Sequence, residues 1–459
     1  MFGARPRRTW VRLDQKRAGM KERLAASYWL HESQYAALSS ATVTERRRVA
    51  MERFEAEGFP TVRHEDWKYT PLKKILKEDY ALSSPFSAQD DAEPIEFKDI
   101  KRYLVNDIDC YRVVFINGRY SSWLSETTHQ GFDVCTLGSA WKKYKDQVEP
   151  HFGRLTESLG ATVQLNTALA WDGLYVRVPD HVTLDKPIQA LYFTTGDQPI
   201  FTQTRSLIVL GEGAKAEIIE RHQSLTTSAS WTNAVDEVFM GAQSHLHWVK
   251  LQHDEASAAL TQHSVIEQKR DSHATVHTIS TDGKFLRNNL DFKLIEPGAE
   301  ARMFGLSLAD GQQLVDHHTR VDHLAPHCTS RENYKGIFDG QSNGVFNGQI
   351  HVHVDAQKTL AFQENDNLIL SEKASIDTKP QLEIFADDVK CSHGCTVGQL
   401  DEDALFYLRA RGIQRKEAQA LLMLAFAHDA VTDIQHPSLQ AKLHRLIGKK
   451  LGVDMTAVI

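Results

Sequence analysis

Residues 211–220 read GEGAKAEIIE, and residues 296–305 read EPGAEARMFG. Two looser copies lie between them, GAQSHLHWVKL (241–251) and DSHATVHTIS (271–280). Each copy is a turn that ends in a small residue and continues as a strand of alternating polarity. The same order of short strand and polar turn fills most of residues 200–400. Many short, evenly spaced strands are typical of a β-sandwich, a barrel or a β-solenoid.

The turns favour the solenoid among these three folds. The segments DGKFLRNN (282–289) and DGQSNGVFNGQIHV (339–352) are rich in Gly and Asn, which tolerate a positive φ. Such residues suit the repeated corners of a coil. The copies are too irregular for the turns of the coil to be counted from the sequence.

The ends of the chain have a helical period. We predict helix over residues 20–58, with a start region at Thr42/Thr44 and an end at Gly58 and Pro60, and then a polar connector. YRVVFINGRY (111–120) predicts a hairpin, and a helical interval follows near 136–170. The predicted units are a basic, disordered tail (1–19), an N-terminal helical domain with its connector (20–110), a β-core (111–398) and a C-terminal helical domain (399–459).

Three helices are expected after Gly398. Asp401 is a plausible N-cap for the first, and Gly412 is its stop. The second carries an apolar stripe that is wider than packing against two neighbours needs. The stripe is either core or a groove for a partner. Candidate partner-facing or core residues on the first two helices are Leu405, Phe406, Leu408, Leu421, Leu422 and Phe426.

Composition excludes several classes of protein. The chain has 459 residues, 25% of them charged, and a net charge of −7, which gives no overall attraction to nucleic acid. It has no apolar run long enough for a membrane span. Five cysteines without a signal peptide favour a reducing compartment, so we expect a cytoplasmic protein, with a plastid as the less favoured alternative. Translation starts at Met1 or at Met20.

The segment ADDVKCSHGCTVG (386–398) contains the best candidate site. In a strand, Cys391 and His393 face the same way, and a thiolate with an imidazole suits zinc or iron–sulfur species. Two ligands do not complete a tetrahedral site, so a partner chain or Cys395 must supply the rest. The alternative is that Cys391 is a small buried residue and His393 a turn residue.

Other candidates are weaker. The pairs His245/His247 and His351/His353 each lie on one face of a strand, where they either chelate a metal or form a polar surface. The chain lacks GxxxxGK[ST], HExxH and a GxGxxG between a strand and a helix, so we expect a binding or scaffold protein that binds no nucleotide itself. Two alternatives remain, a β-solenoid enzyme acting on carbohydrate and a self-contained metalloprotein.

The signature at residues 386–413 resembles the C-terminal region of the SufD family, subunits of the SUF (SufBCD) iron–sulfur cluster assembly complex. GFPTVRHEDWKYTPL (58–72), FINGRY (115–120) and LNTALAWDGLYVRVPDHVTLDKPIQ (165–189) are similar to other parts of that family. The resemblance covers residues 20–451. It implies a mainly β fold, with a right-handed parallel β-helix between N-terminal and C-terminal helical domains.

The resemblance also implies a function. The chain would be a non-catalytic scaffold that pairs with a SufB-like chain through the β-helix and with a SufC-like ABC-type ATPase through the C-terminal helices. It would support iron entry and the formation of a transient iron–sulfur cluster shared with the partner. In the family, the histidine at the position of His393 is the proposed cluster-proximal residue, with the cysteine at the position of Cys391 beside it. Cys395 departs from the family pattern and carries no implied role, and a homodimer in isolation remains open.

Overall fold

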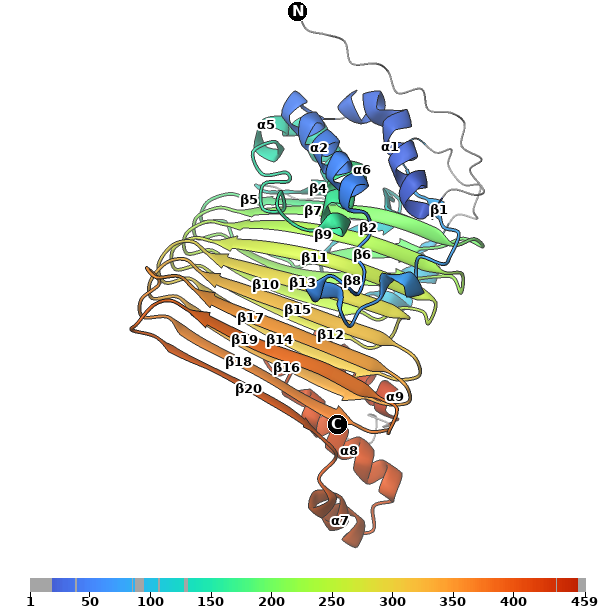
Figure 1. Cartoon of the computed structure of the whole chain (residues 1–459), viewed down its shortest axis with the longest axis vertical. Helices are drawn as coiled ribbons and strands as arrows, with labels where there is room; N and C mark the ends of the chain where they lie inside the picture. Colours follow the sequence, from blue (N-terminus) through green and yellow to red (C-terminus); the bar gives the residue numbers. More distant parts are fainter. Residues whose placement is uncertain are drawn as a thin grey trace, which may run out of the picture.

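The computed structural model describes residues 19–37, 39–84, 86, 95–105, 108–127, 131–434 and 436–452. The tail predicted at 1–19 therefore lies outside the described residues, apart from Gly19. Figure 1 shows a β-solenoid with helices at both ends. The helices are α1 (Met20–Ala37), α2 (Ala41–Glu57), η1 (Glu65–Trp67), η2 (Leu72–Lys74), α3 (Phe97–Ile100), η3 (Lys101–Tyr103), α4 (Leu137–Lys143), α5 (Lys145–Val148), α6 (Ala161–Leu169), α7 (Glu402–Ala410), α8 (Arg415–His428) and α9 (Pro437–Leu451).

Two sheets form the walls of the solenoid, and successive strands alternate between them. Sheet A has the order β19-β17-β15-β13-β11-β9-β7-β5-β4, with β1 beside β7, and sheet B has the order β20-β18-β16-β14-β12-β10-β8-β6-β2-β3. All pairs are parallel except β2–β3 and β4–β5. The predicted mainly β solenoid with helical ends is confirmed.

The strand bounds follow the chain order. They are β1 (Ala81–Leu82), β2 (Tyr111–Ile116), β3 (Arg119–Tyr120), β4 (Asp133–Thr136), β5 (Leu174–Val178), β6 (Ile188–Thr194), β7 (Ile200–Leu210), β8 (Lys215–Ser224), β9 (Ser230–Met240), β10 (His245–Gln252), β11 (Ala258–Gln268), β12 (His273–Ser280), β13 (Phe285–Leu294), β14 (Glu300–Ala309), β15 (Leu314–His323), β16 (Thr329–Phe338), β17 (Asn343–Val352), β18 (Leu360–Ile369), β19 (Ser375–Ile384) and β20 (Lys390–Gly398).

The four similar segments of the sequence are four successive turns of the solenoid. Lys215 pairs with His245, His245 with His273, and His273 with Glu300, so β8, β10, β12 and β14 stack in register. The prediction that these copies are structural repeats is confirmed. The turns differ in length, since Ala259 pairs with Phe285 whereas Asn343 pairs with Ser375.

A residue in the left-handed conformation marks the corner before each of the strands β8, β10, β12, β14, β16 and β18. The corner residues with positive φ between 54° and 77° are Gly213, Gln243, Asp271, Gly298, His327 and Lys358. The left-handed conformation recurs at each corner, but the residue type changes. Residues other than Gly rarely adopt this conformation, and here the stacking of neighbouring turns holds them in it. The copies in the sequence are irregular because the residue type at each corner can vary.

The turn and helix-capping residues at the two ends of the chain have the predicted conformations. Asn117 and Gly118 both have positive φ in the β2–β3 turn, and Gly58 is the C-cap of α2 with a φ of 69°. The Asp401 side chain accepts hydrogen bonds from the N–H groups of Asp403 and Ala404, as an N-cap does. The helix predicted over 20–58 is two helices, and the start region predicted at Thr42/Thr44 lies just after the observed start of the second at Ala41. Ser40 caps the N–H of Val43 and starts a second helix there.

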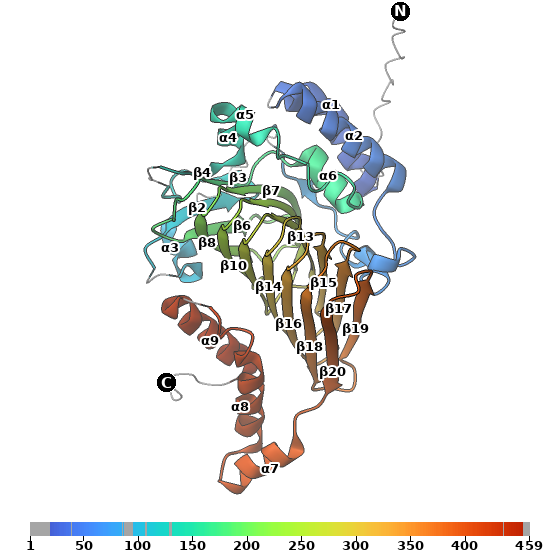
Figure 2. The ribbon, with the colours of Figure 1, turned by 90° about the vertical axis from the view of Figure 1, so that its left-hand side faces the viewer.

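Helices cover both walls. On sheet A, the fully buried α6 lies under α2, and the Arg47 guanidinium donates to the carbonyls of Thr167, Ala168 and Ala170. On sheet B, the second half of α8 and α9 pack against the outer apolar face, whereas α7 projects beyond it (Figure 2). No helix in the described part of the chain has the length and apolar character of a membrane span.

Candidate functional site

Cys391, His393 and Cys395 lie on the same face of the last strand of sheet B. In the parallel pairing of β18 and β20, Ala361 lies beside Cys391, Gln363 beside His393, and Asn365 beside Cys395. Those three β18 residues are buried inside the solenoid. Because side chains alternate along a strand, the two cysteines and His393 point to the interior of the last turn.

The last turn is open to solvent. In the described part of the chain, no strand pairs with the outer edge of β19 or β20, which end their two sheets (Figure 1). His393 and Cys395 are exposed although they face inward, and Cys391 is half-buried. The inward-facing side chains of this last turn therefore form part of the molecular surface.

Cys391 lies at the covered end of this surface. It packs against an apolar cluster that contains Val352, Ala361 and Ala386. Burial raises the pKa of the Cys391 thiol. The thiol is therefore protonated in the free chain at neutral pH, and binding a metal would release that proton.

The three side chains do not form a complete metal site on this chain. The Cys395 thiol donates to the Thr378 hydroxyl at 3.2 Å, on the facing strand β19. Among the described residues, no hydrogen bond involves the His393 ring, and no third donor joins Cys391 and His393 within coordination distance. The structure thus brings the three predicted residues to one face of β20. The site that they form is open at the unpaired edge of that strand.

A polar column that the sequence analysis missed runs inward from His393. Gln363 donates to the Glu332 carboxylate at 2.6 Å, so His393, Gln363 and Glu332 occupy the same inward row on β20, β18 and β16. Burial raises the pKa of Glu332 to about 7, against the opposing effect of hydrogen bonds from Thr319 and Gln363. Only the register reveals this row, because Glu332 is an ordinary charged residue in the sequence.

The raised pKa of Glu332 predicts a pH dependence of stability. Between the ordinary Glu pKa of about 4.3 and a pKa of about 7, the folded chain holds a proton that the unfolded chain has released. Raising the pH in this window should therefore destabilise the fold by about 1.4 kcal/mol per pH unit through this group. Glu332→Gln should abolish that contribution.

Urea unfolding of the two proteins across this window measures the difference. The buried His317 and His323 have pKa values lowered to about 4 by burial, and they make stability rise with pH. They are common to both proteins, so their effect cancels in the comparison. Parallel stability curves for the wild type and Glu332→Gln would contradict the prediction.

Apolar side chains gather at the open end of the solenoid. Phe385 is 60% exposed and Val397 is 52% exposed, and Ile384, Val354 and Leu360 are exposed as well. Long unpaired strand edges with exposed apolar residues are ready to pair with another chain. The open end therefore has the character of an interface.

The six candidate partner-facing residues of the C-terminal helices separate into three groups. Leu405 is buried, and Phe426 packs on the apolar face of sheet B with the Lys335 ammonium over its ring. Leu408, Leu421 and Leu422 are half-buried. Phe406 is 71% exposed, and its neighbour Tyr407 is 54% exposed. Of the three candidates on α8, Phe426 thus packs on the chain's own solenoid, and the exposed aromatic surface lies on α7.

The histidine pairs differ from each other. The His245 ring stacks on that of His273, and the nearest carboxylate to His247 is Glu217 at 3.5 Å. His351 and His353 have Asp322 beside them.

Two family models match the chain. Residues 192–426 match the model described as SUF system FeS cluster assembly, SufBD core domain. Residues 19–190 match the SufBD protein N-terminal region. The two matches together span both the solenoid and the helices that cover sheet A.

Curated relatives agree with these matches. The chain is 31% identical to the iron–sulfur cluster assembly protein SufD of Escherichia coli, over 86% of this chain and 90% of the relative. It is 29% identical to an iron–sulfur cluster assembly SufBD family protein of Synechocystis, over 88% and 90%. It is 28% identical to the chloroplastic protein ABCI7 of Arabidopsis thaliana, over 82% and 85%.

Proposed function

We propose that this chain, which belongs to the SufBD family of the SUF iron–sulfur cluster assembly system, is a scaffold subunit with no catalytic activity of its own. In this proposal it pairs with a SufB-like chain through the open end of the solenoid. Cys391 and His393 contribute half of the site at which a nascent cluster forms. The protein works in the cytoplasm, as a bacterial relative named SufD suggests.

The main observation behind the proposal is that the candidate ligands Cys391 and His393 lie at the open end of the solenoid. Cys391 and His393 face the interior of the last turn, which no further turn covers among the described residues. A partner that continued both sheets would enclose these side chains and place its own donors opposite them. Thiolate and imidazole donors are suited to iron and to iron–sulfur species.

The pairing would use the backbone of β20. Lys390 donates its N–H to the carbonyl of Thr359, the residue just before β18, at 2.9 Å. Backbone groups alternate in direction along a strand, so the N–H groups of Cys391, His393, Cys395 and Val397 point to the free edge. These groups are available to a strand of the SufB-like partner.

The C-terminal helices would bind the ATPase. α7 stands away from the solenoid and presents Phe406 and Tyr407, while the Arg411 guanidinium lies 4.0 Å from the centre of the Tyr407 ring (Figure 2). Exposed aromatic residues flanked by arginine are characteristic of interface hot spots. The chain contains no P-loop motif, and the ATPase partner would supply nucleotide hydrolysis.

Val397→Pro tests the edge pairing. Proline removes the outward N–H of Val397 and leaves the hydrogen bonds of β20 to β18 in place. We expect about tenfold weaker capture of a SufB-like chain in a co-expression pull-down, since main-chain hydrogen bonds give such edges their affinity.

Val397→Thr is the matched control, because it keeps both the N–H and a β-branched side chain. It should bind as the wild type does, and urea midpoints show whether the proline variant remains folded. Equal capture by the wild type and a folded Val397→Pro variant would contradict edge pairing. Failure of the wild type to capture either a SufB-like chain or a SufC-like ATPase would contradict the proposed function itself.

A further inference from the structure

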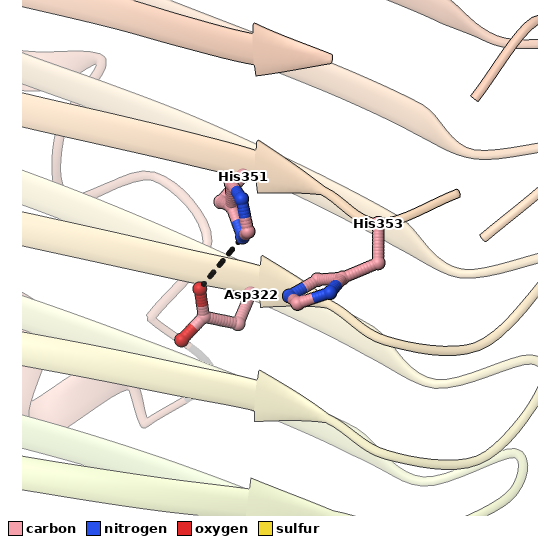
Figure 3. Close-up of side chains that lie close together, drawn as sticks. All are labelled: Asp322, His351 and His353. Carbon is pink, nitrogen blue, oxygen red and sulfur yellow. Dashed lines mark ion pairs between the residues drawn. The ribbon is translucent and has the colours of Figure 1, made fainter. Parts of the chain in front are cut away.

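Three potential metal ligands meet on the outer face of sheet A, away from the Cys391–His393 surface. Asp322 on β15 and His351 on β17 are direct neighbours in the register, and His353 lies two residues further along. Their donor atoms all lie within 4.8 Å of one another. Figure 3 shows the His353 ring beside the dashed contact between Asp322 and His351. Within the described ranges, no other three His, Cys, Asp or Glu side chains come so close.

The ring of His351 is oriented between two carboxylates. Its Nδ1 atom is 3.4 Å from Asp322 Oδ1, and its Nε2 atom is 3.9 Å from Glu383 Oε2 on β19. Nδ1 is buried and makes no hydrogen bond with any described residue. Metal-binding histidines commonly use one ring nitrogen as the ligand, while a carboxylate lies near the other nitrogen and orients the ring. Nδ1 of His351 would be the ligand atom, and Glu383 would be the supporting carboxylate near Nε2.

The position of Asp322 is fixed by Arg320. The guanidinium donates to Oδ1 at 3.0 Å and 2.9 Å and to Oδ2 at 3.1 Å, and it also reaches Gln349 at 3.3 Å. A carboxylate has about four lone-pair positions, so these bonds leave capacity for a metal. The positive charge of Arg320 opposes a cation, which limits the affinity of the site without removing a ligand.

We propose that Asp322, His351 and His353 bind a divalent first-row transition-metal ion, such as Zn²⁺ or Fe²⁺. Two imidazoles with one carboxylate suit these ions, whereas Mg²⁺ prefers oxygen ligands alone. The three side chains are half-buried, so positions on the ion stay open to water and the metal is exchangeable. The site has no thiolate and is distinct from the surface proposed to hold the nascent cluster.

Titration of the full chain with Co²⁺, a coloured substitute for Zn²⁺, tests the proposal. The titration uses a Cys391→Ala, His393→Ala background, so that the proposed cluster site contributes no signal. We expect one Co²⁺ bound per chain, with visible d–d absorption that Zn²⁺ removes and Mg²⁺ does not. Anaerobic competition with Fe²⁺ then ranks the two candidate metals.

The variants His351→Ala and His353→Ala should each weaken Co²⁺ binding at least about tenfold, since each removes a ligand. His263→Ala is the matched control. Its ring lies 2.7 Å from Asp291 on the same face of sheet A, but that pair has no third donor among the described residues. Equal Co²⁺ binding by all three variants, or no binding by the parent chain, would overturn the proposal. Urea midpoints establish that the variants remain folded.

Discussion

Glu237→Ala is expected to lower the free energy of unfolding by about 3–5 kcal/mol, because it leaves a buried arginine without its counter-charge. Arg205 is 0% exposed and Glu237 is 1% exposed, with 2.6 Å between Arg205 Nη2 and Glu237 Oε2. Both side chains are almost fully shielded from bulk solvent, so water does not screen the pair. Urea unfolding followed by circular dichroism measures the effect.

The same pair joins the helical interval to the solenoid. Glu237 on β9 accepts the N–H groups of Gly153 and Leu155, while Arg205 on β7 donates to Thr156 and to Asn166 on α6. Its loss should therefore release residues 153–169 from sheet A before the solenoid unfolds. Hydrogen exchange would detect this as faster exchange confined to that segment.

Glu267→Ala is the matched control. Glu267 pairs with Arg154 at 2.5 Å, but the arginine side chain is 45% exposed and water screens the pair. The expected loss is below about 1 kcal/mol. Comparable losses in the two variants would show that burial does not set the strength of these ion pairs.

The solenoid could be predicted because its signals are local. Gly- and Asn-rich corners, alternating strands and the copies at 211–220 and 296–305 each need only a few consecutive residues. The number of turns could not be predicted. The corner conformation recurs with residues as different as Gly213, Gln243 and Lys358, because stacking between turns outweighs local preference there.

The polar groups inside the solenoid could not be predicted either. The Lys250 ammonium donates to Ser264 at 2.6 Å and lies 3.6 Å from Asp236, and all three residues are buried. A lysine, an aspartate and a serine give no signal of burial in the sequence. Which face of a strand is inward depends on pairing with turns about 30 residues away, as the register of β9 with β11 shows.

The candidate site was predictable only where it depends on local spacing and not on the pairing of distant strands. The spacing of Cys391 and His393 predicts that they share a face, and the register confirms it. Asp322 was missed as a companion of His351, because the two meet only through the pairing of β15 with β17. The stripe on α8 was ambiguous, since a helix sequence does not distinguish a partner chain from the chain's own sheet.

His393→Ala is expected to lower the yield of cluster on the reconstituted complex about a hundredfold. Loss of groups that merely support a ligand already costs about 10- to 100-fold in metal affinity, and His393 is proposed as a ligand itself. The complex consists of this chain, a SufB-like chain and a SufC-like ATPase, supplied anaerobically with iron and sulfide. Visible absorption of the cluster and iron content measure the yield.

The exposure of His393 makes this test specific to the site. Its ring packs in no apolar cluster of the described residues and has no hydrogen bond there, so the variant should fold and assemble as the wild type does. Cys395→Ala is the matched control on the same face, and it should keep the wild-type yield because that thiol is directed to Thr378. An assembled His393→Ala complex with wild-type yield would remove His393 from the site. A loss in Cys395→Ala as large as that in His393→Ala would instead make Cys395 a ligand, and the half-site would then have three donors on this chain.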